Sequence, residues 1–242
     1  MQKLIGLLLV LGISTATLRA QHYEIYKGDT INHKDTKGLK QGLWRKYYRT
    51  DTLFSETIFK DDKPVNESRT WYECGKLKAI VTFDKNNSKR ANGWSYYESG
   101  KLLAKGIYNN QKKDSTWIYY GENDSIKSIE FYKNGVPDKT WKVYYENGKL
   151  AEETTFLNGK KAGVHKEYNE DGVLIFEMPY KNDIAEGRAS LYYINGKLKE
   201  SGMYHNGLRE GAWTRYEANG NKLRELHYKN GVSKEPETEE EH

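Results

Sequence analysis

The feature that most constrains the fold is a short pattern that recurs eight times along the chain. In each copy an aliphatic residue is followed six residues later by tyrosine or phenylalanine, and the copies recur with a period of 24 or 25. Such a fixed period is typical of repeat architectures, in which each copy is one supersecondary unit that packs on its neighbours. The pairs are Leu53/Phe59, Leu77/Phe83, Leu102/Tyr108, Ile126/Tyr132, Leu150/Phe156, Leu174/Tyr180, Leu198/Tyr204 and Leu223/Tyr228, the last being one residue shorter.

Tryptophan follows the same period and is expected to begin each copy. Five copies begin with Trp44, Trp94, Trp117, Trp141 and Trp213, and one or two tyrosines usually come next. In the other three copies, Val164 holds the expected place of the tryptophan, and Arg69 and Ala189 replace it in two degenerate copies.

The copy from residue 140 to 163, TWKVYYENGKLAEETTFLNGKKAG, predicts one β-hairpin. Trp141 and the two tyrosines favour a short strand. Asn147 and Gly148 tolerate the left-handed conformation of a tight turn. Leu150 to Phe156 is the return strand, and because six residues separate its ends, both side chains are expected on one face. The single cysteine, Cys74, falls where Asn147 falls, so it is read as a turn residue.

Eight such hairpins predict an all-β protein, an elongated single antiparallel β-meander of tandem 24-residue hairpins. Ile, Leu, Val and Phe make up only about 19% of the chain, which is too few for a thick aliphatic core or for the apolar strands of a doubly wound α/β enzyme. The tyrosine-rich, proline-poor composition nevertheless favours strands over disorder. The alternative is a four-bladed propeller, with two copies in each blade.

The ends of the chain predict its organisation and location. Residues 1–20 carry Lys3, a ten-residue apolar core and a polar end at Ala20, so they predict a secretory signal peptide cleaved between Ala20 and Gln21. Residues 21–41 are expected to cap the repeats, 42–232 to form the repeat domain, and 233–242 to be an acidic disordered tail. The mature chain would be secreted or periplasmic and without a transmembrane segment.

The unit G-x-W-x-x-Y-Y-x-N-G-K-L…Y-x-N-G resembles the MORN repeat in its bacterial variant form. The resemblance is carried by Trp141, Tyr144, Tyr145, Gly148, Leu150, Phe156, Asn158 and Gly159 and by their counterparts one repeat away, over residues 38–232. It implies tandem hairpins in an elongated sheet that act as scaffolds or interaction modules, some of them proposed to bind lipid. Many bacterial relatives carry an antitoxin label. The resemblance implies no catalytic residue.

The sequence offers no constellation for catalysis, metal binding or a cofactor. It contains no G-x-G-x-x-G, G-x-S-x-G or H-E-x-x-H motif, and the histidines within the repeats occupy different repeat positions. The net charge is +5, but lysines alternate with acidic residues, which argues against a nucleic-acid interface. We therefore expect a protein without enzymatic activity or cofactor.

Two binding functions remain open for such a chain. The first is a scaffold that presents its sheet to an envelope protein. The second is a module for cell-wall glycan or lipid headgroups, in which aromatic rings stack on the ligand. The candidate ligand ladder consists of Trp44, Trp94, Trp117, Trp141, Trp213, Tyr97, Tyr120, Tyr145 and Tyr193, although the same rings could be the core. Asp-Ser and Asp-Thr triplets, such as the one at Asp51, leave O-glycosylation or ordinary turns as alternatives.

Overall fold

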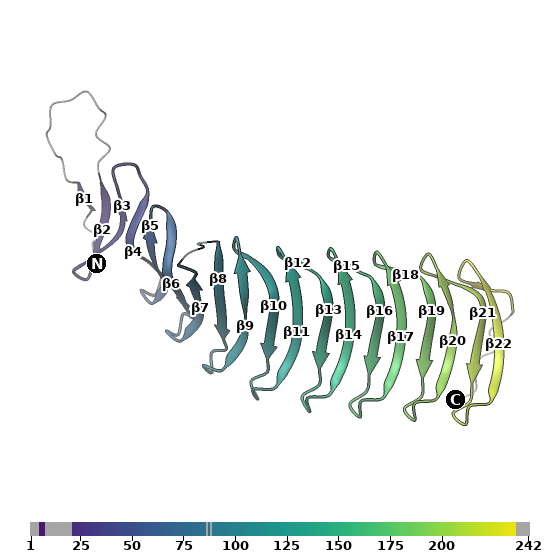
Figure 1. Cartoon of the computed structure of the whole chain (residues 1–242). Coiled ribbons are helices and arrows are strands. Elements are labelled where there is room, and N and C mark those ends of the chain that lie inside the picture. Colours follow the sequence, from purple (N-terminus) through teal and green to yellow (C-terminus); the bar gives the residue numbers. More distant parts are fainter. Residues whose placement is uncertain (1–4, 8–20, 86, 88, 236–242) are drawn as a thin grey trace. The chain divides into compact units, whose positions relative to one another are not determined.

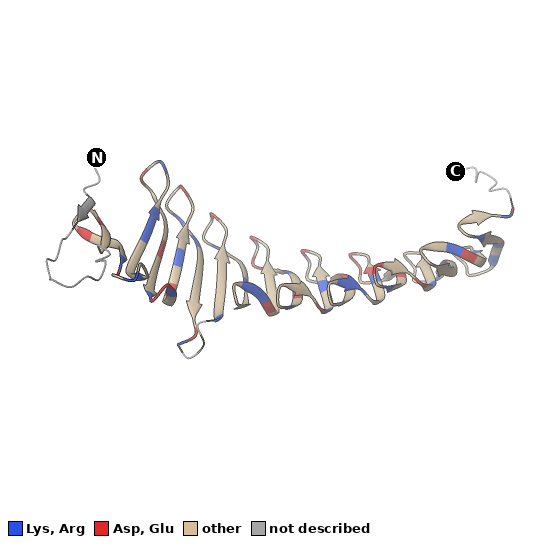
Figure 2. Ribbon diagram, turned by 90° about the horizontal axis from the view of Figure 1, so that it is seen from above, with Lys and Arg blue, Asp and Glu red and all other residues tan. Residues whose placement is uncertain are grey.

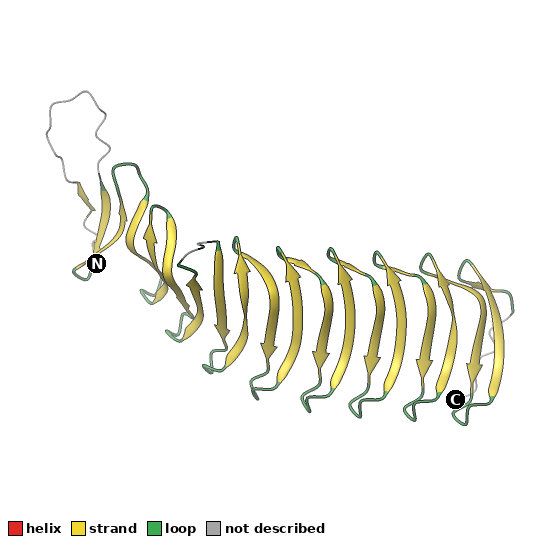
Figure 3. Cartoon of the chain, in the orientation of Figure 1, coloured by secondary structure: helices red, strands yellow, loops and turns green. Residues whose placement is uncertain are grey.

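The computed structural model describes residues 5–7, 21–85, 87 and 89–235, with side chains from residue 21 onward. Most of the expected signal peptide, including Ala20, and residues 236–242 of the expected tail lie outside the described residues. The chain forms two compact units, residues 1–113 and residues 114–242. The described residues form strands, turns and loops, with no helix among them (Figure 3).

The described residues of the first unit form a series of short strands (Figure 1). Residues 21–41, the expected cap, hold the hairpin of the second and third strands and reach into the fourth, and Ile31 is almost fully buried there. The strands are β1 (Ile5–Leu7), β2 (His22–Tyr26), β3 (Asp29–Lys34), β4 (Lys40–Tyr47), β5 (Leu53–Lys60), β6 (Lys63–Trp71), β7 (Leu77–Phe83), β8 (Arg90–Tyr96) and β9 (Leu102–Asn109).

The second unit repeats one hairpin more regularly. The strands are β10 (Lys112–Tyr120), β11 (Ile126–Lys133), β12 (Val136–Pro137), β13 (Lys139–Tyr144), β14 (Leu150–Leu157), β15 (Lys160–Lys161), β16 (Gly163–Tyr168), β17 (Leu174–Lys181), β18 (Ile184–Ala185), β19 (Gly187–Tyr192), β20 (Leu198–His205), β21 (Leu208–Tyr216), β22 (Lys222–Lys229) and β23 (Val232–Ser233).

Within each unit the strands pair antiparallel in the order of the chain, which confirms the meander. In the second unit the pairing runs from β10 and β11 through β13, β14, β16 and β17 to β22 and β23 without interruption. A propeller would break the ladder after every fourth strand. The four-bladed alternative is therefore wrong, and the sheet is open. Basic and acidic residues are interspersed along the strands (Figure 2).

Each copy uses two different turns. At Asn158 and Gly159 both φ values are positive, 51° and 84°, as a two-residue hairpin turn matched to strand twist requires. At the other end Gly148 alone has a positive φ, and its N–H donates to the carbonyl of Tyr145. That turn is a three-residue loop, so the expected pair of left-handed residues at Asn147 and Gly148 is wrong. The side chain of Asn147 instead accepts the N–H of Lys149.

A β-bulge follows this loop and decides which side chains share a face. Leu150 lies opposite Tyr144, but Glu152 already lies opposite Val143, so Ala151 is an extra residue in the ladder. The extra residue shifts the alternation of side chains by one. Leu150 and Phe156 therefore lie on opposite faces, and the prediction that they share one face is wrong.

We name the two faces after their aromatic residues. The Tyr face carries the aromatic residue that ends the first strand of each hairpin, for example Tyr144, and the residue opposite it, for example Leu150. This aromatic residue is a tyrosine in every copy except the second, where it is Trp71. The Trp face carries the residue three positions before it, which we call the Trp place, and the aromatic residue that closes each copy, such as Phe156. The buried cluster of the second unit, which includes Met178, Ala189, Trp213, Leu226 and Tyr228, lies on the Trp face.

In the last copy, the residue opposite the strand-ending tyrosine falls 24 residues after Leu198, not 25. Tyr216 lies opposite Lys222. Lys222 therefore holds the aliphatic place, and Leu223, which was assigned to it, is 51% exposed. The prediction of Leu223 is wrong because it follows residue type, whereas the strand register places Lys222 opposite Tyr216. Tyr228 closes the copy as expected.

Candidate functional site

Strand register corrects the expected places of several ladder residues. The Trp place is held by Trp44, Ser68, Gly93, Trp117, Trp141, His165, Ala189 and Trp213. Trp94 is one residue out of register, lies opposite Lys105, and so belongs to the Tyr face. His165, not Val164, and Ser68, not Arg69, hold the places of two missing tryptophans, whereas Ala189 is as predicted.

Trp141 on the Trp face packs between the closing aromatics of two neighbouring copies. The ring of Trp141 lies 5.0 Å from Tyr132 and 4.8 Å from Phe156, measured between centroids. Its Nε1 donates a hydrogen bond of 2.8 Å to the main-chain carbonyl of Phe131 in the preceding hairpin. Such rings join consecutive hairpins and are part of the core, not of a free ladder.

Trp213 makes the same contacts and is only 2% exposed. It lies edge-on between Tyr204 and Tyr228, and its Nε1 donates to the carbonyl of Met203. The guanidinium of Arg209 covers the ring at 4.1 Å. Trp117 is also buried, at 3%. Two of the five candidate tryptophans therefore have almost no surface left for a ligand.

Two of the expected tyrosines are held by hydrogen bonds between copies. The hydroxyl of Tyr145 donates to the carbonyl of Tyr168, 2.6 Å away, and that of Tyr193 donates to the carbonyl of Tyr216, 2.8 Å away. Tyr97 occupies the same repeat position. Tyr120 does not, because it lies opposite Ile126 and so ends the first strand on the Tyr face. Tyr145 and Tyr193 are thus ties between hairpins.

His165 is a buried residue that the sequence analysis missed. Its Nδ1 lies 2.7 Å from Oγ1 of Thr154, and its Nε2 lies 3.0 Å from Oε1 of Glu167. The ring packs edge-on against Phe176 and Tyr180. It could have been found from the spacing alone, because His165 follows Trp141 by one full period of 24 and Val164 falls one position short.

Burial keeps several hydroxyls on the sheet protonated. Burial, followed by a hydrogen bond to Glu130, raises the pKa of Tyr132 far above its usual range. Burial also raises the pKa of Tyr192, whose hydroxyl donates to Glu177 at 2.8 Å. These tyrosines act as fixed donors to carboxylates and are not poised for acid–base chemistry near neutral pH.

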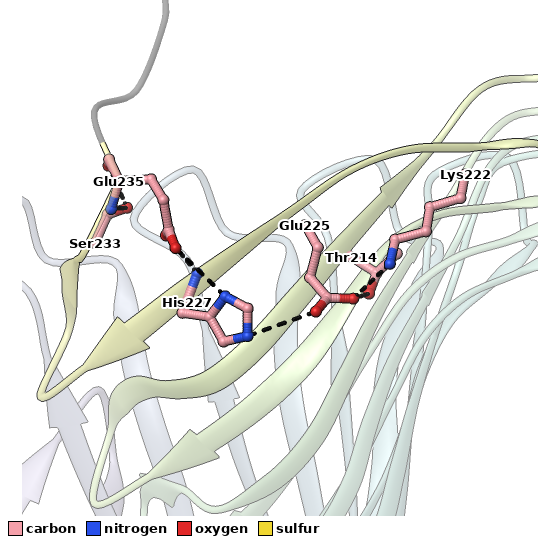
Figure 4. Close-up of polar contacts among 6 residues, drawn as sticks. All are labelled: Thr214, Lys222, Glu225, His227, Ser233 and Glu235. Carbon is pink, nitrogen blue, oxygen red and sulfur yellow. Dashed lines mark hydrogen bonds and ion pairs between the residues drawn. The ribbon is translucent and has the colours of Figure 1, made fainter.

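A row of polar contacts closes the C-terminal end of the second unit (Figure 4). Glu235 accepts the main-chain N–H of His227, and this bond lowers the pKa of the carboxyl group. The Glu225 carboxylate accepts a hydrogen bond of 2.7 Å from Nζ of Lys222, and this bond lowers the pKa of Glu225. The same carboxylate also lies close to the His227 ring. The hydrogen bond of Glu235 ties the segment that follows β23 to strand β22.

The first unit contains a groove of about 610 Å³ on its Trp face. The groove lies over Ser68 and Ala91, on strands whose Trp places are Ser68 and Gly93. Its walls include the closing aromatics of three copies, and lysine and amide groups stand at its rim. The lining residues are Thr57, Phe59, Asp62, Lys63, Pro64, Ser68, Val81, Phe83, Lys89, Ala91, Tyr108, Asn110 and Gln111.

The second unit leaves a row of aliphatic side chains exposed beside its two-residue turns. We call this the aliphatic row, and its members are Val136, Ile184, Leu208 and Val232, with exposed fractions of 41%, 48%, 47% and 70%. Lys160 holds the same position in the remaining copy. Three of the row's side chains pack against the turn glycine of the next copy, at Gly159, Gly207 and Gly231. The row is therefore anchored on one side and open on the other.

Within residues 21–85, 87 and 89–235, no group of three His, Cys, Asp or Glu side chains is placed to hold a metal ion. The described part of the chain also holds no helix of the length and apolar character needed to cross a bilayer.

The fold and the two faces define a protein built from tandem β-hairpin repeats. A family model described as "MORN repeat variant" matches six consecutive segments, which together cover just over half of the chain. The chain belongs to the MORN repeat variant family. The matched residues are 95–110, 113–134, 137–158, 161–182, 185–206 and 209–230.

Solved structures with some similarity come from much larger proteins. The Photorhabdus luminescens Tc holotoxin pore carrying TccC3-D651A is 12% identical, with a TM-score of 0.22 over 88% of this chain and 13% of that one. TcdB2–TccC3 is also 12% identical, with a TM-score of 0.24 over 86% of this chain and 14% of that one. This chain thus spans about an eighth of the length of those chains. No curated protein matches the sequence.

Proposed function

We propose that this chain is an exported, non-enzymatic repeat protein that acts as a scaffold by binding a protein partner at the cell envelope. The observation that carries the proposal is that the aromatic ladder is used inside the sheet. Trp117 and Trp213 are buried, and Tyr145 and Tyr193 tie neighbouring hairpins together. A ligand ladder for glycans would need rings with free faces.

The aliphatic row is the surface that we assign to this contact. Its members recur with the period of 24 or a multiple of it, beside the two-residue turns, and each follows an asparagine two residues earlier in the chain. Apolar side chains rimmed by polar groups are typical of protein–protein contacts. Export follows from the expected signal peptide, and since antitoxins usually act in the cytoplasm, export favours a scaffold over an antitoxin role.

The proposal is tested by photo-crosslinking in the producing cells, with a crosslinking residue in place of Leu208 and mass spectrometry of the products. Recovery of one stoichiometric envelope protein is the expected result. Retention of the chain on purified cell wall, with no protein recovered, would establish the glycan alternative and overturn the proposal.

A double variant, Ile184→Lys with Leu208→Lys, tests the surface itself. Lys160 shows that lysine is tolerated at this position of the repeat. We expect the variant to fold and to lose the crosslinked partner. The matched control is Ile194→Lys, because Ile194 is 80% exposed, lies in the turn between β19 and β20 at the other end of the hairpin from the row, and is replaced by a charged residue in other copies, as Glu146 and Glu170. Equal capture by the double variant and the control would remove the row from the interface.

A further inference from the structure

The groove of the first unit lies over a copy that has no tryptophan at its Trp place. Ser68 holds the Trp place and lies between Thr57 and Val81 on the neighbouring strands. The closing aromatics that would flank an indole there, Phe59 and Phe83, are both present and both line the groove. The hollow therefore has the walls of a tryptophan site without the tryptophan.

The second unit shows what fills this space in a complete copy. Trp141 lies between the two corresponding rings, Tyr132 and Phe156, and its Nε1 donates to the carbonyl of Phe131. The carbonyl that corresponds to Phe131 in the first unit belongs to Ile58, ten residues before Ser68. The Ser68 side chain is instead turned to Thr57, with 2.6 Å between the two hydroxyl oxygens.

The rim of the groove carries a positive balance of charge. Lys63 and Lys89 line it, together with one carboxylate, Asp62. Asp62 is already engaged, because its Oδ1 accepts the main-chain N–H of Lys40 at 2.8 Å. Asn110 and Gln111 add amide groups that can hydrogen-bond to a main chain. Such a rim suits a peptide with an acidic residue next to its apolar anchor.

We propose that the groove is a docking site for one tryptophan side chain, carried by a segment of a partner protein with acidic residues beside it. The indole would lie between Phe59 and Phe83 as Trp141 lies between its own two neighbours, and it would complete the repeat in trans. Buried aromatic anchors of this kind dominate the energy of many protein interfaces. The inference rests on the proposed function, since it names the chemistry of the partner.

The first test uses blocked tripeptides and the mature chain, residues 21–242. Titration with N-acetyl-Asp-Trp-Glu-amide, followed by NMR, is expected to show saturable shifts at groove residues. Replacing the tryptophan by leucine should weaken binding at least about tenfold, because the flat ring and its N–H are both lost. No saturable shift with the tryptophan peptide, or equal binding of the leucine peptide, would overturn the inference. So would tighter binding of a di-N-acetylglucosamine probe at the same residues.

The second test fills the groove from within. Ser68→Trp should restore the pattern of the complete copies, raise the melting temperature and abolish peptide binding. If that variant does not fold, Phe83→Leu serves instead, since it removes one ring wall but keeps an apolar side chain. Lys63→Gln with Lys89→Gln should weaken binding severalfold, whereas Lys160→Gln with Lys181→Gln in the second unit should not. Unchanged binding in the groove variants would overturn the inference.

The failure of this inference is distinguishable from the failure of the proposed function. If Ser68→Trp captures the envelope protein as well as the natural chain does, while Ile184→Lys with Leu208→Lys does not, the scaffold function stands and the groove is not the docking site. If no protein is captured by any form, the proposed function itself fails.

Discussion

Gly202 lies directly beneath the indole ring of Trp213, so closely that a Cβ at position 202 would overlap Cγ, Cδ2 and Cε2 of the ring. Across the ladder Gly202 lies opposite Ala189, which is fully buried and holds the Trp place of its own copy. The loss of tryptophan at 189 and the glycine at 202 thus make room for the tryptophan of the next hairpin. Packing on the Trp face is shared between copies and is not completed within one.

Gly202→Ala is therefore expected to destabilise the second unit by about 1–3 kcal/mol, the usual cost of overpacking a filled core. Urea unfolding of the mature chain, followed by circular dichroism, measures the loss. In a Trp213→Leu background the same alanine should cost much less, because the ring that it meets is gone. Equal costs in both backgrounds would show that the indole does not set the requirement for glycine.

Removing the hydroxyl that ties two hairpins should lower stability without changing the fold. Tyr145→Phe is expected to cost about 1 kcal/mol, since the hydrogen bond to the Tyr168 carbonyl is lost. Tyr144→Phe is the matched control, because within the described residues the Tyr144 hydroxyl makes no hydrogen bond. Tyr145→Phe should therefore unfold at a lower temperature than Tyr144→Phe. The reverse order would contradict the role of Tyr145 as a tie between hairpins.

His165 and His205 provide a second matched pair. His165 is 6% exposed and contacts Thr154 and Glu167, whereas the side chain of His205 is 64% exposed. His165→Leu is expected to cost about 1–3 kcal/mol because it leaves a buried threonine hydroxyl without one of its partners. His205→Leu should stay within about 0.5 kcal/mol. Chemical denaturation checks both, and similar losses would mean that the buried network adds nothing.

Acidification should open the C-terminal strands first. The pKa of Glu235 is lowered by the N–H of His227, and that of Glu225 by Lys222. A carboxyl whose pKa is lower in the folded state adds stability above its unfolded value, about 4.3, and this stability is lost as the pH falls through the folded value. The main-chain N–H of Lys234 donates to the carbonyl of His227 at 2.8 Å, so it reports on this contact. Exchange of the Lys234 amide, corrected for its intrinsic rate, should therefore rise below about pH 4.

Two glutamate variants, one as the test and one as the control, check the assignment of this pH dependence. Glu235→Gln should make the Lys234 amide exchange faster already at neutral pH and should reduce its further change on acidification. Glu217→Gln, on the opposite turns of the sheet, should leave the profile unchanged. A profile that is the same in all three proteins would contradict the assignment to Glu235.

Much of the fold is readable from the period of 24, because both turns of a hairpin depend on local residue types. The two-residue turn requires a positive φ that glycine adopts without strain, and glycine recurs there at 135, 159, 207 and 231, whereas Asp62, Gln111 and Asp183 adopt the same conformation in other copies. The face on which each side chain lies could not be predicted from the period. The bulge at Ala151 is created by pairing with Val143 and Tyr144 across the hairpin, and it reverses the face of each side chain beyond it. Trp94 shows the same limit, since one step of register moves it to the Tyr face.

The sequence by itself determined the unit, its period and the order in which the hairpins follow, because these depend on turns and strand propensities within a single repeat. Only the tertiary structure decided which residues share a face and which rings are buried. Those properties depend on the register between strands and on residues of the neighbouring copy. Gly202, which belongs to the copy before Trp213, leaves the space that the indole ring fills. The groove over Ser68 likewise depends on the tertiary structure, because its walls, Phe59 and Phe83, come from neighbouring strands.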